Sequence, residues 1–376
     1  MKKKILVMYA RYGSGHKTIA EYVAKYIEEH NKDANVMLLD MTDYANGFGK
    51  ITVKLFDFVS KHRTEKIFDF CYELMDHKFS SIGYNTSMKK SYDNESLRQV
   101  ISNFNPDVTI SSHFYCSSII TYYNELKLIN SKLLTIITDY RTHEWWTRNH
   151  KKVTGFIVGN EMVKQELIYR GVERKKIYAF GLPLNINQIN KLDERELILK
   201  RYNIKGNRKI YLFFGGSTSG SMYYYDYFKC IAKLNINADI IFISGKNTKL
   251  KSKCEEYVKD NNIKNIKVLG FSTDVFNLMK ISDLVISKPG GATVTECLEM
   301  HRPMLLVPGL GGQEKYNAKF ISKKKYGIRV KGLWGFKIWI KRLEESPEVL
   351  NTIKRRLDKQ SKNKSVEKIN DLAMKL

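Results

Sequence analysis

A histidine stands at the start of a predicted helix, directly after a glycine-rich turn. The turn contains Gly13 and Gly15 and ends at His16; it follows an apolar run at 5–9 and opens a helical run at 17–30. Glycine lets a backbone approach a ligand closely, and the free N–H groups at a helix start favour phosphate. Because histidine titrates near neutral pH, it suits a general base that takes a proton from an attacking hydroxyl. We therefore predict that His16 is catalytic and that the two glycines contact a phosphate-bearing donor substrate. The alternative is that His16 is a surface residue that caps the helix.

A second glycine-rich turn follows the apolar run at 284–287 and again leads into a helix. Backbone N–H groups and a threonine hydroxyl in such a turn can hold a diphosphate. Glu296 lies three residues after Thr293 and on the same helical face, so its carboxylate could accept hydrogen bonds from ribose hydroxyls. The alternative is a tight turn whose glutamate only favours the helix dipole. The candidate phosphate-binding residues are Pro289, Gly290, Gly291, Ala292 and Thr293.

A third glycine-rich turn follows the next apolar run, at 304–307, and should lie beside the second turn at the same edge of a sheet. It supplies amide and carboxylate groups of the kind that bind sugar hydroxyls. A further turn, after the apolar run at 210–214, adds Gly216 and Ser217 as candidate donor contacts. Two adjacent turns, each with an acidic residue near a helix start, are more informative than either alone. The candidates for donor binding in the third turn are Gly312, Gln313, Glu314 and Asn317.

Acidic, imidazole and aromatic side chains cluster at 138–146, at the end of a predicted strand. Asp139 is a candidate catalytic residue, and His143, Trp145 and Trp146 are candidate acceptor or membrane contacts. A packed loop is the alternative. No D-x-D motif occurs in the chain, so a divalent-metal site for sugar transfer is not indicated. A metal-free transferase must neutralise a leaving diphosphate with N–H groups and basic side chains, and the glycine-rich turns supply the N–H groups.

Short runs of branched apolar residues alternate with helical patterns, which predicts an α/β chain of parallel sheets flanked by helices. At 376 residues the chain is too long for one ordinary domain. We predict an N-terminal domain at 1–185, a linker at 186–207, a C-terminal domain at 208–335 and a basic helical segment at 336–376. The predicted strands are 5–9, 36–39, 108–111, 134–137, 156–158 and 177–180, followed by 210–214, 240–243, 266–269, 284–287 and 304–307.

The net charge of +25 at pH 7 is the compositional feature with functional content. Residues 1–185 carry 27 basic and 20 acidic side chains, and residues 186–376 carry 37 and 19, so the excess lies in the second half. Such a positive charge attracts nucleic acid, anionic lipid headgroups or nucleotide phosphates. The alternative is that an AT-rich genome enriches the whole sequence in lysine. The five cysteines fit neither a zinc site nor a disulfide framework, which is typical of a reducing cytoplasm.

Residues 44–95 interrupt the alternation and mix large apolar residues with lysine and arginine. This mixture is typical of an amphipathic surface that seats in a bilayer interface, and also of helices on a sheet with a solvated basic face. Phe56, Phe58 and Phe68 are the candidate membrane contacts. The start of the chain has too few apolar residues for a signal peptide, and its longest uncharged stretch, near 108–124, is too polar for a membrane span. We therefore expect a soluble or peripheral protein.

Together these residues resemble glycosyltransferase family 28, and within it the branch of the diacylglycerol glucosyltransferases and monogalactosyldiacylglycerol synthases. The resemblance spans roughly residues 4–330, and the ordered series of motifs is far more specific than any one of them. The residues that carry it are Gly13 to His16, Thr138, Asp139, His143, Trp146, Gly171, Val172, Lys176, Ile177, Gly181 to Pro183, Gly270, Phe271, Asp283, Lys288 to Thr293, Glu296, Pro303, Gly312 to Glu314 and Asn317.

The resemblance implies a GT-B fold, in which two Rossmann-like domains face each other across a central cleft and the C-terminal one binds UDP. It implies that Gly290 to Thr293 meet the diphosphate, that Glu296 meets the ribose and that Gln313 and Glu314 hold the sugar, with His16 as base or donor contact. The implied reaction is an inverting transfer of a hexose, for which we expect glucose, from a UDP-sugar to diacylglycerol or a glycolipid. No metal or other cofactor is expected, and addition of a second sugar is common in this branch.

The implied partners are a UDP-hexose, a diacylglycerol or glycolipid acceptor and an anionic membrane surface at the cytoplasmic face of the cell membrane. A lipid-linked N-acetylglucosaminyltransferase of peptidoglycan synthesis is the nearest alternative, since it shares similar motifs. A non-hydrolysing UDP-sugar epimerase shares the architecture and needs no lipid surface. A basic nucleic-acid-binding protein is the alternative from another class, although no nucleic-acid motif is present and we expect no such partner.

Overall fold

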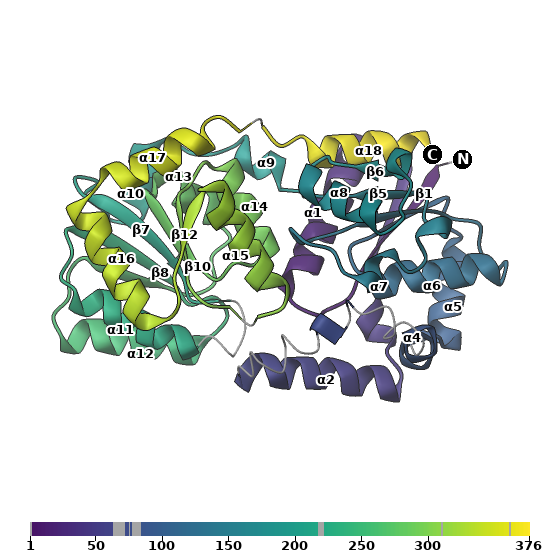
Figure 1. Cartoon of the computed structure of the whole chain (residues 1–376), viewed down its shortest axis with the longest axis horizontal. Helices are drawn as coiled ribbons and strands as arrows, with labels where there is room; N and C mark the ends of the chain where they lie inside the picture. The colour runs from purple at the N-terminus through teal and green to yellow at the C-terminus, as the bar shows by residue number, and fades with distance from the viewer. Residues whose placement is uncertain are drawn as a thin grey trace. The chain divides into compact units, whose positions relative to one another are not determined.

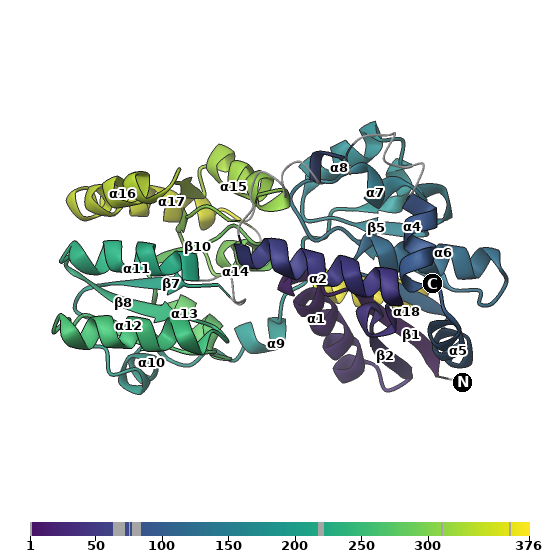
Figure 2. The same cartoon turned by 90° about the horizontal axis from the view of Figure 1, so that it is seen from below.

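The computed structural model describes residues 2–62, 72–74, 76, 84–216, 222–309, 311–360 and 362–376. The chain forms two compact units, each built on its own sheet (Figure 1, Figure 2). Unit 1 comprises Met1–Val59, Glu65–Asn185 and Asn363–Leu376, and unit 2 comprises Ile186–Lys362 with Ser60–Thr64.

Unit 1 is built on a parallel sheet of six strands in the order β2-β1-β3-β4-β5-β6. Every residue of β3 and of the apolar part of β1 is buried, so both faces of the central strands are covered, as expected of a parallel sheet. This explains why the strands read as continuous apolar runs rather than alternating ones. The strands are β1 (Lys3–Tyr9), β2 (Ala34–Asp40), β3 (Val108–Ser111), β4 (Lys132–Ile136), β5 (Gly155–Ile157) and β6 (Ile177–Tyr178).

Helices connect the strands of unit 1, and several of them bury apolar side chains. In α5, for example, Leu97 and Ile101 are buried at a spacing of four residues, and the side chain of Asn94 caps the first turn by accepting from the N–H of Leu97. The helices are α1 (Ser14–His30), α2 (Gly47–His62), α4 (Tyr84–Tyr92), α5 (Glu95–Phe104), α6 (Phe114–Glu125), α7 (Glu144–Thr147), α8 (Glu161–Tyr169) and α18 (Ser365–Lys375), with short 3-10 turns at Met41–Tyr44, His150–Lys152 and Arg174–Lys176.

Unit 2 repeats the plan with a parallel sheet in the order β12-β11-β10-β7-β8-β9. Its strands are β7 (Lys209–Phe214), β8 (Ala238–Ile243), β9 (Ile266–Leu269), β10 (Leu284–Ser287), β11 (Met304–Leu306) and β12 (Gly327–Arg329). Its helices are α9 (Ile186–Ile189), α10 (Arg195–Arg201), α11 (Tyr224–Lys233), α12 (Thr248–Asp260), α13 (Val275–Ile281), α14 (Gly291–Glu299), α15 (Gln313–Lys324), α16 (Leu333–Glu345) and α17 (Glu348–Leu357).

The last helix, α18, returns to unit 1 and packs beside α1 (Figure 1). Its Val366, Ile369 and Ala373 are buried. Polar contacts fix both of its ends. The hydroxyl of Ser365 donates to the carbonyl of Leu182 at 2.9 Å, and the ammonium of Lys3 donates to the carbonyl of Met374 at 2.8 Å. The residues 336–376, expected as one basic segment, are thus divided between the two units.

The predicted α/β fold with two parallel sheets is confirmed, and each of the eleven predicted strands overlaps an observed one. The prediction missed β12, whose residues Gly327–Arg329 include a single branched apolar side chain and so leave no apolar run. The stretch 186–207, predicted as a linker, contains α9 and α10, which group with unit 2. Only one residue of α10, Ile198, is buried, so no apolar stripe marks this helix.

Candidate active site

The first glycine-rich turn lies at the point in unit 1 where the order of the strands in the sheet reverses. The chain leaves β1 for β2 on one side and later returns to β3 on the other. Open α/β sheets bind ligands at this point, beyond the carboxyl ends of the strands. Gly13, with φ of 102°, makes the turn into α1 in a region that favours glycine. His16 on α1 therefore lies at the reversal point, together with the residues that follow β3.

Hydrogen bonds and burial fix the protonation state of His16. The side chain is buried, and its Nδ1 lies 2.6 Å from the carbonyl oxygen of Ser112 and 3.2 Å from Oγ1 of Thr138. A carbonyl oxygen can only accept, so Nδ1 carries the hydrogen and Nε2 is left as an acceptor. Burial lowers the pKa of His16 to about 4, so the ring is neutral at pH 7. The arrangement can accept a proton at Nε2.

Asp139 reaches this histidine through a neighbouring hydroxyl. The hydroxyl of Thr138 donates to Oδ2 of Asp139 over 3.4 Å, while its oxygen lies against Nδ1 of His16. Asp139 is thus connected to the imidazole through one intervening hydroxyl, that of Thr138. The sequence named both His16 and Asp139 but gave no sign of the link through Thr138, which depends on the parallel pairing of β3 with β1 and β4.

Two further histidines surround His16 in a buried aromatic cluster. His113 lies after β3 with its ring centroid 4.7 Å from that of His16, and its Nδ1 accepts from the backbone N–H of Tyr115, which caps α6. His143 is also buried, and its Nδ1 has no hydrogen-bond partner among the described residues. Burial lowers the pKa of His143 to about 3 and the pKa of His113 well below its ordinary value. The sequence gave no role to His113, although its position directly after a predicted strand was a usable signal.

The predicted acceptor residues of the 138–146 stretch belong to the same cluster. Trp146 and His143 are each 4% exposed, and Trp145 is half-buried. The ring of Phe114 lies edge-on to His143, Trp145 and Trp146, with centroid distances of 5.2, 5.6 and 5.4 Å. Their side chains therefore line the interior beside His16, where the buried pair His143 and Trp146 would not touch a bilayer.

Helix α2 presents a row of exposed apolar side chains. Phe48, Ile51, Leu55 and Phe58 are 48%, 62%, 59% and 56% exposed. Their spacings of three, four and three residues place them on one face of the helix. Phe58 is therefore exposed, and the membrane contact predicted for it stays a prediction. The side chain of Phe56, and Phe68 altogether, lie outside the described residues.

In unit 2 the glycine-rich turns likewise gather at the carboxyl edge of the sheet. The chain leaves β7 for β8 on one side and returns to β10 on the other, and β11 lies next to β10. The turns after β7, β10 and β11 therefore follow three neighbouring strands. Gly216, Gly311 and Gly312 have φ of 86°, 91° and 54°, which favours glycine at each position. Ser217 lies outside the described residues.

The second turn delivers the start of α14. Gly290 precedes the helix and Gly291 begins it, and the first N–H groups of any helix have no intrahelical acceptor. A Cβ on Gly290 would meet nothing within 4 Å, so the space in front of the turn is open. The hydroxyl of Thr295 donates back to the carbonyl of Gly291 at 2.8 Å. Pro289, Ala292, Thr293 and the mostly buried Glu296 lie on the same turn and helix.

The third turn supports the second one through buried contacts that the sequence did not suggest. Glu314, predicted to hold a sugar, is buried and accepts from the ammonium of Lys288, with 2.5 Å between Oε1 and Nζ. Asn317 is fully buried and donates from Nδ2 to the carbonyl of Pro289 at 3.0 Å. The two turns are thus tied together, and Lys288 places an ammonium beside them. Gln313, at the start of α15, remains partly exposed.

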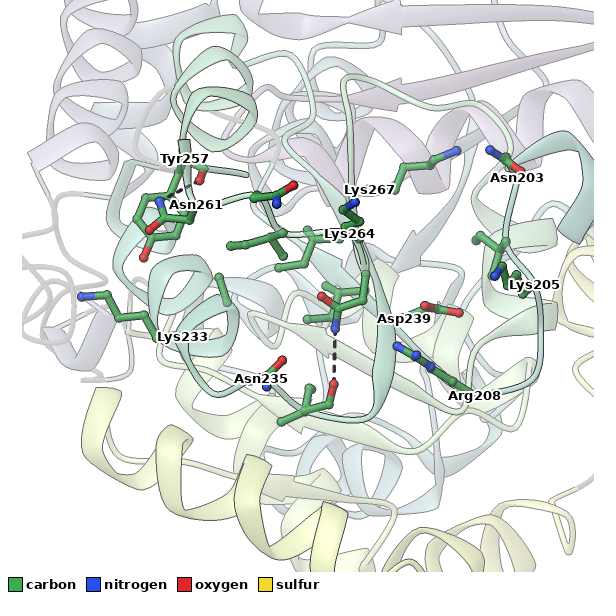
Figure 3. A pocket seen from close by; sticks show the side chains of 18 of the residues that line it. Asn203, Lys205, Arg208, Lys233, Asn235, Asp239, Tyr257, Asn261, Lys264 and Lys267 are labelled. Atoms are coloured by element: carbon green, nitrogen blue, oxygen red, sulfur yellow. Dashed lines mark hydrogen bonds between the residues drawn. The ribbon is translucent and has the colours of Figure 1, made fainter. Parts of the chain in front are cut away.

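A cavity of about 900 Å³ opens at the other edge of this sheet, where β7, β8 and β9 begin (Figure 3). None of the candidate donor residues lines it. Lys205, Arg208 and Lys264 stand around it with a single carboxylate, that of Asp239. It is a basic depression, separate from the glycine-rich turns.

The described part of the chain contains no group of three or more histidine, cysteine, aspartate or glutamate side chains that could hold a metal ion. Four of the cysteines lie in this part, and all four are free thiols. No helix within the described ranges is both long and apolar enough to cross a membrane.

Two family descriptions match the chain. "Monogalactosyldiacylglycerol (MGDG) synthase" matches residues 16–184, and "Glycosyltransferase family 28 C-terminal domain" matches residues 210–376. The chain is 25% identical over 342 residues to a processive diacylglycerol beta-glucosyltransferase of Bacillus subtilis, covering 87% of this chain and 83% of that protein. A protein of the same description from Staphylococcus aureus is 24% identical over 326 residues, covering 86% and 80%.

Solved structures share the architecture at low identity. MurG of Acinetobacter baumannii has a TM-score of 0.64 at 13% identity, with both chains covered completely. The UDP-GlcNAc 2-epimerase of Neisseria meningitidis, bound to UDP-GlcNAc, also has a TM-score of 0.64 at 13% identity, over 99% of this chain and 100% of that one. These likenesses show a two-domain fold of the GT-B type.

Proposed function

Because the chain is a UDP-sugar-dependent glycosyltransferase of family 28, with an N-terminal half of the MGDG synthase type, we propose that it glucosylates diacylglycerol. The donor is UDP-glucose, and the product is a β-linked glyceroglycolipid formed with inversion at the anomeric carbon. The observation that carries this proposal is the similarity to diacylglycerol beta-glucosyltransferases, which runs through both units of the chain.

Unit 2 is proposed to bind the donor through its glycine-rich turns. The N–H groups at the start of α14 suit a diphosphate, and the ammonium of Lys288 adds a positive charge beside them. Glu296 is assigned to the ribose hydroxyls, and Gln313 to the sugar. Glu314 is engaged with Lys288, so its role includes holding that ammonium in place. N–H groups and an ammonium supply the charge stabilisation that the leaving UDP needs, so transfer is proposed to proceed without a metal.

His16 is proposed as the general base. The acceptor oxygen forms a bond to the anomeric carbon, and the bond from that carbon to the diphosphate oxygen breaks, so the electron pair leaves with UDP. The hydroxyl proton passes to Nε2 of His16, which the hydrogen bond at Nδ1 leaves free to accept it. A single displacement of this kind inverts the anomeric centre. The negative charge of the UDP would favour the protonated ring, since a nearby anion raises the pKa of an imidazole.

The acceptor is proposed to be reached at the cytoplasmic face of an anionic membrane. The exposed apolar row of α2 (Phe48, Ile51, Leu55 and Phe58) supports this, because an interfacial helix buries such a face among lipid headgroups. The net charge of +25 supports an anionic surface. Addition of a second glucose to the product is part of the proposal, on the strength of the relatives described as processive.

The test is transfer of radiolabelled sugar from UDP-glucose or UDP-galactose into vesicles that contain diacylglycerol, with EDTA present. The expected product is a β-glucosyl lipid from UDP-glucose alone, followed by a slower diglucosyl lipid. Product from UDP-galactose alone would reassign the sugar. No product from either donor, with UDP binding measured separately and intact, would refute the diacylglycerol acceptor and favour the lipid-linked acceptor of peptidoglycan synthesis.

A further inference from the structure

The outer face of α16 in unit 2 carries apolar side chains where a soluble helix would be polar. The helix buries Phe336, Ile340 and Leu343 against the core. Trp334, two positions before Phe336, points about 200° away around the helix and is 79% exposed. Ile338, one turn further on, is 41% exposed on the same face. The helix therefore buries one apolar face against the core and exposes two further apolar side chains on the opposite, solvent-facing side.

Lysines surround this apolar face. Helix α11 packs against α16, and exposed lysines lie on both helices. Among the described residues, Asp226 alone brings a carboxylate to the lining of the groove between them, and it is paired with Lys229 at 3.0 Å. Lys233 and Lys337 have no ion-pair partner among the described residues. The groove is lined by Asp226, Lys229, Cys230, Lys233, Leu333, Trp334 and Lys337.

The positive charge continues beyond the groove. Lys233, at the end of α11, also lines the cavity at the amino edge of the sheet, where Figure 3 shows it with Lys264 and Arg208. The one carboxylate in that lining belongs to Asp239. We use the term Trp334 surface for Leu333, Trp334, Ile338, Lys233, Lys337 and Lys341. It combines a protruding tryptophan, two aliphatic side chains and three lysines, with a basic depression at its border.

We propose that the Trp334 surface docks unit 2 onto an anionic lipid bilayer. Tryptophan is enriched at the headgroup level of membranes, where its ring is buried and its N–H stays solvated. Lysines near a bilayer are attracted by acidic lipids. Leu333 and Ile338 favour a bilayer over a nucleic acid, because aliphatic side chains gain from burial among acyl chains and gain little from a phosphate backbone. The inference extends the proposed function, since an embedded acceptor requires contact with a bilayer, and it adds a contact on unit 2 to that of α2.

The experiment measures sedimentation of the full chain with vesicles of phosphatidylcholine alone, or mixed in equal parts with phosphatidylglycerol. Trp334→Ala should weaken binding to the anionic vesicles about tenfold, from the apolar area withdrawn from the interface. The double change Lys337→Glu with Lys341→Glu should weaken it at least about 30-fold, from the loss of two lysine contacts. Lys354→Glu with Arg355→Glu on α17 alters the net charge equally and is the matched control. Exposed Tyr169 in unit 1, changed to alanine, is the control for Trp334.

A spectroscopic readout reports on Trp334 itself. Anionic vesicles should shift the tryptophan emission of the unchanged protein to shorter wavelength, and brominated lipid should quench it, whereas Trp334→Phe should still bind but lose most of the quenching. Equal quenching in Trp334→Phe, or unchanged binding of Trp334→Ala, would overturn the proposal. Loss of single-stranded DNA binding in Trp334→Ala, with vesicle binding intact, would overturn it in favour of a nucleic acid.

Transfer assays separate this inference from the proposed function. Trp334→Ala should lose activity on diacylglycerol embedded in vesicles and keep it on a soluble short-chain diacylglycerol. If the unchanged protein transfers no sugar to either acceptor, the proposed function fails while the vesicle-binding result stands on its own. If Trp334→Ala lowers transfer to both acceptors equally, the surface acts on catalysis or folding, and the docking proposal is wrong.

Discussion

Acidification should destabilise unit 1 because His16, His113 and His143 are buried in their neutral form. Burial lowers the pKa of His16 to about 4 and that of His143 to about 3, and it lowers the pKa of His113 in the same direction. In the unfolded chain a histidine titrates near pH 6.5. The unfolded chain therefore binds protons that the folded unit excludes. The stability that these groups contribute is complete above about pH 6.5 and is lost as the pH falls toward about 4.

The size of the effect follows from the two pKa values of each histidine. A histidine with a pKa near 6.5 in the unfolded chain and near 4 in the folded one lowers the free energy of unfolding by about 2 kcal/mol when the pH falls from about 8 to about 5. His143 costs about the same, so these two residues together remove about 4 kcal/mol. That is a large part of the roughly 5–15 kcal/mol by which an ordinary domain is stable.

The assay is the free energy of unfolding in urea at several pH values, followed by tryptophan fluorescence. Trp334→Phe and Trp339→Phe in the background leave Trp145 and Trp146 as reporters of unit 1. His143→Phe keeps a ring in the cluster and removes a buried Nδ1 that has no hydrogen-bond partner among the described residues. It should reduce the loss between about pH 8 and about pH 5 by about 2 kcal/mol. His30→Gln, at an exposed position on α1, is the matched control. An unchanged pH dependence in His143→Phe would refute the reasoning.

Three further predictions concern the two sites. His16→Ala should lower turnover by about 10²–10⁴ by removing the base, while UDP affinity measured by calorimetry stays close to that of the unchanged protein; an unchanged rate would contradict the assignment. Glu296→Ala should weaken UDP binding itself, and intact affinity would show that the ribose contact lies elsewhere. Gly309→Ala should destabilise unit 2 by about 1–3 kcal/mol, because the new Cβ would collide with Oε2 of the buried Glu314. Thermal unfolding measures this loss, and Gly290→Ala, where a Cβ meets nothing within 4 Å, is its control; equal midpoints would contradict the packing argument.

The sequence was sufficient for the sheets because parallel strands buried on both faces leave continuous apolar runs. The places of His16 and of the glycine-rich turns, between a strand and a helix, could also be predicted, since such a turn is a local feature. The sequence was insufficient for individual side-chain contacts between residues that are far apart in the chain. The hydrogen bond from His16 to Ser112 and the ion pair of Lys288 with Glu314 join residues 96 and 26 positions apart. No local pattern encodes such a contact, which is why Glu314 was assigned to the sugar alone.

The histidine cluster illustrates the same limit. His16, His113 and His143 follow three different strands, and their convergence depends on the order β1-β3-β4 in the sheet. Each histidine alone could equally be a surface residue. The exposure of Trp334 could not be predicted from the sequence either, because apolar residues occur on more than one face of α16 and any of these faces could be the buried one.

The return of α18 to unit 1 has a consequence for biosynthesis. Unit 1 cannot bury Val366, Ile369 and Ala373 against its own residues until the whole of Ile186–Lys362 has been translated. At about 5–20 residues per second, the ribosome takes roughly 10–35 s over that stretch. During this interval the nascent unit 1 exposes the surface that α18 later covers, including the neighbourhood of α1. Unit 1 is therefore completed only after unit 2 has been synthesised, although most of its own residues are made earlier.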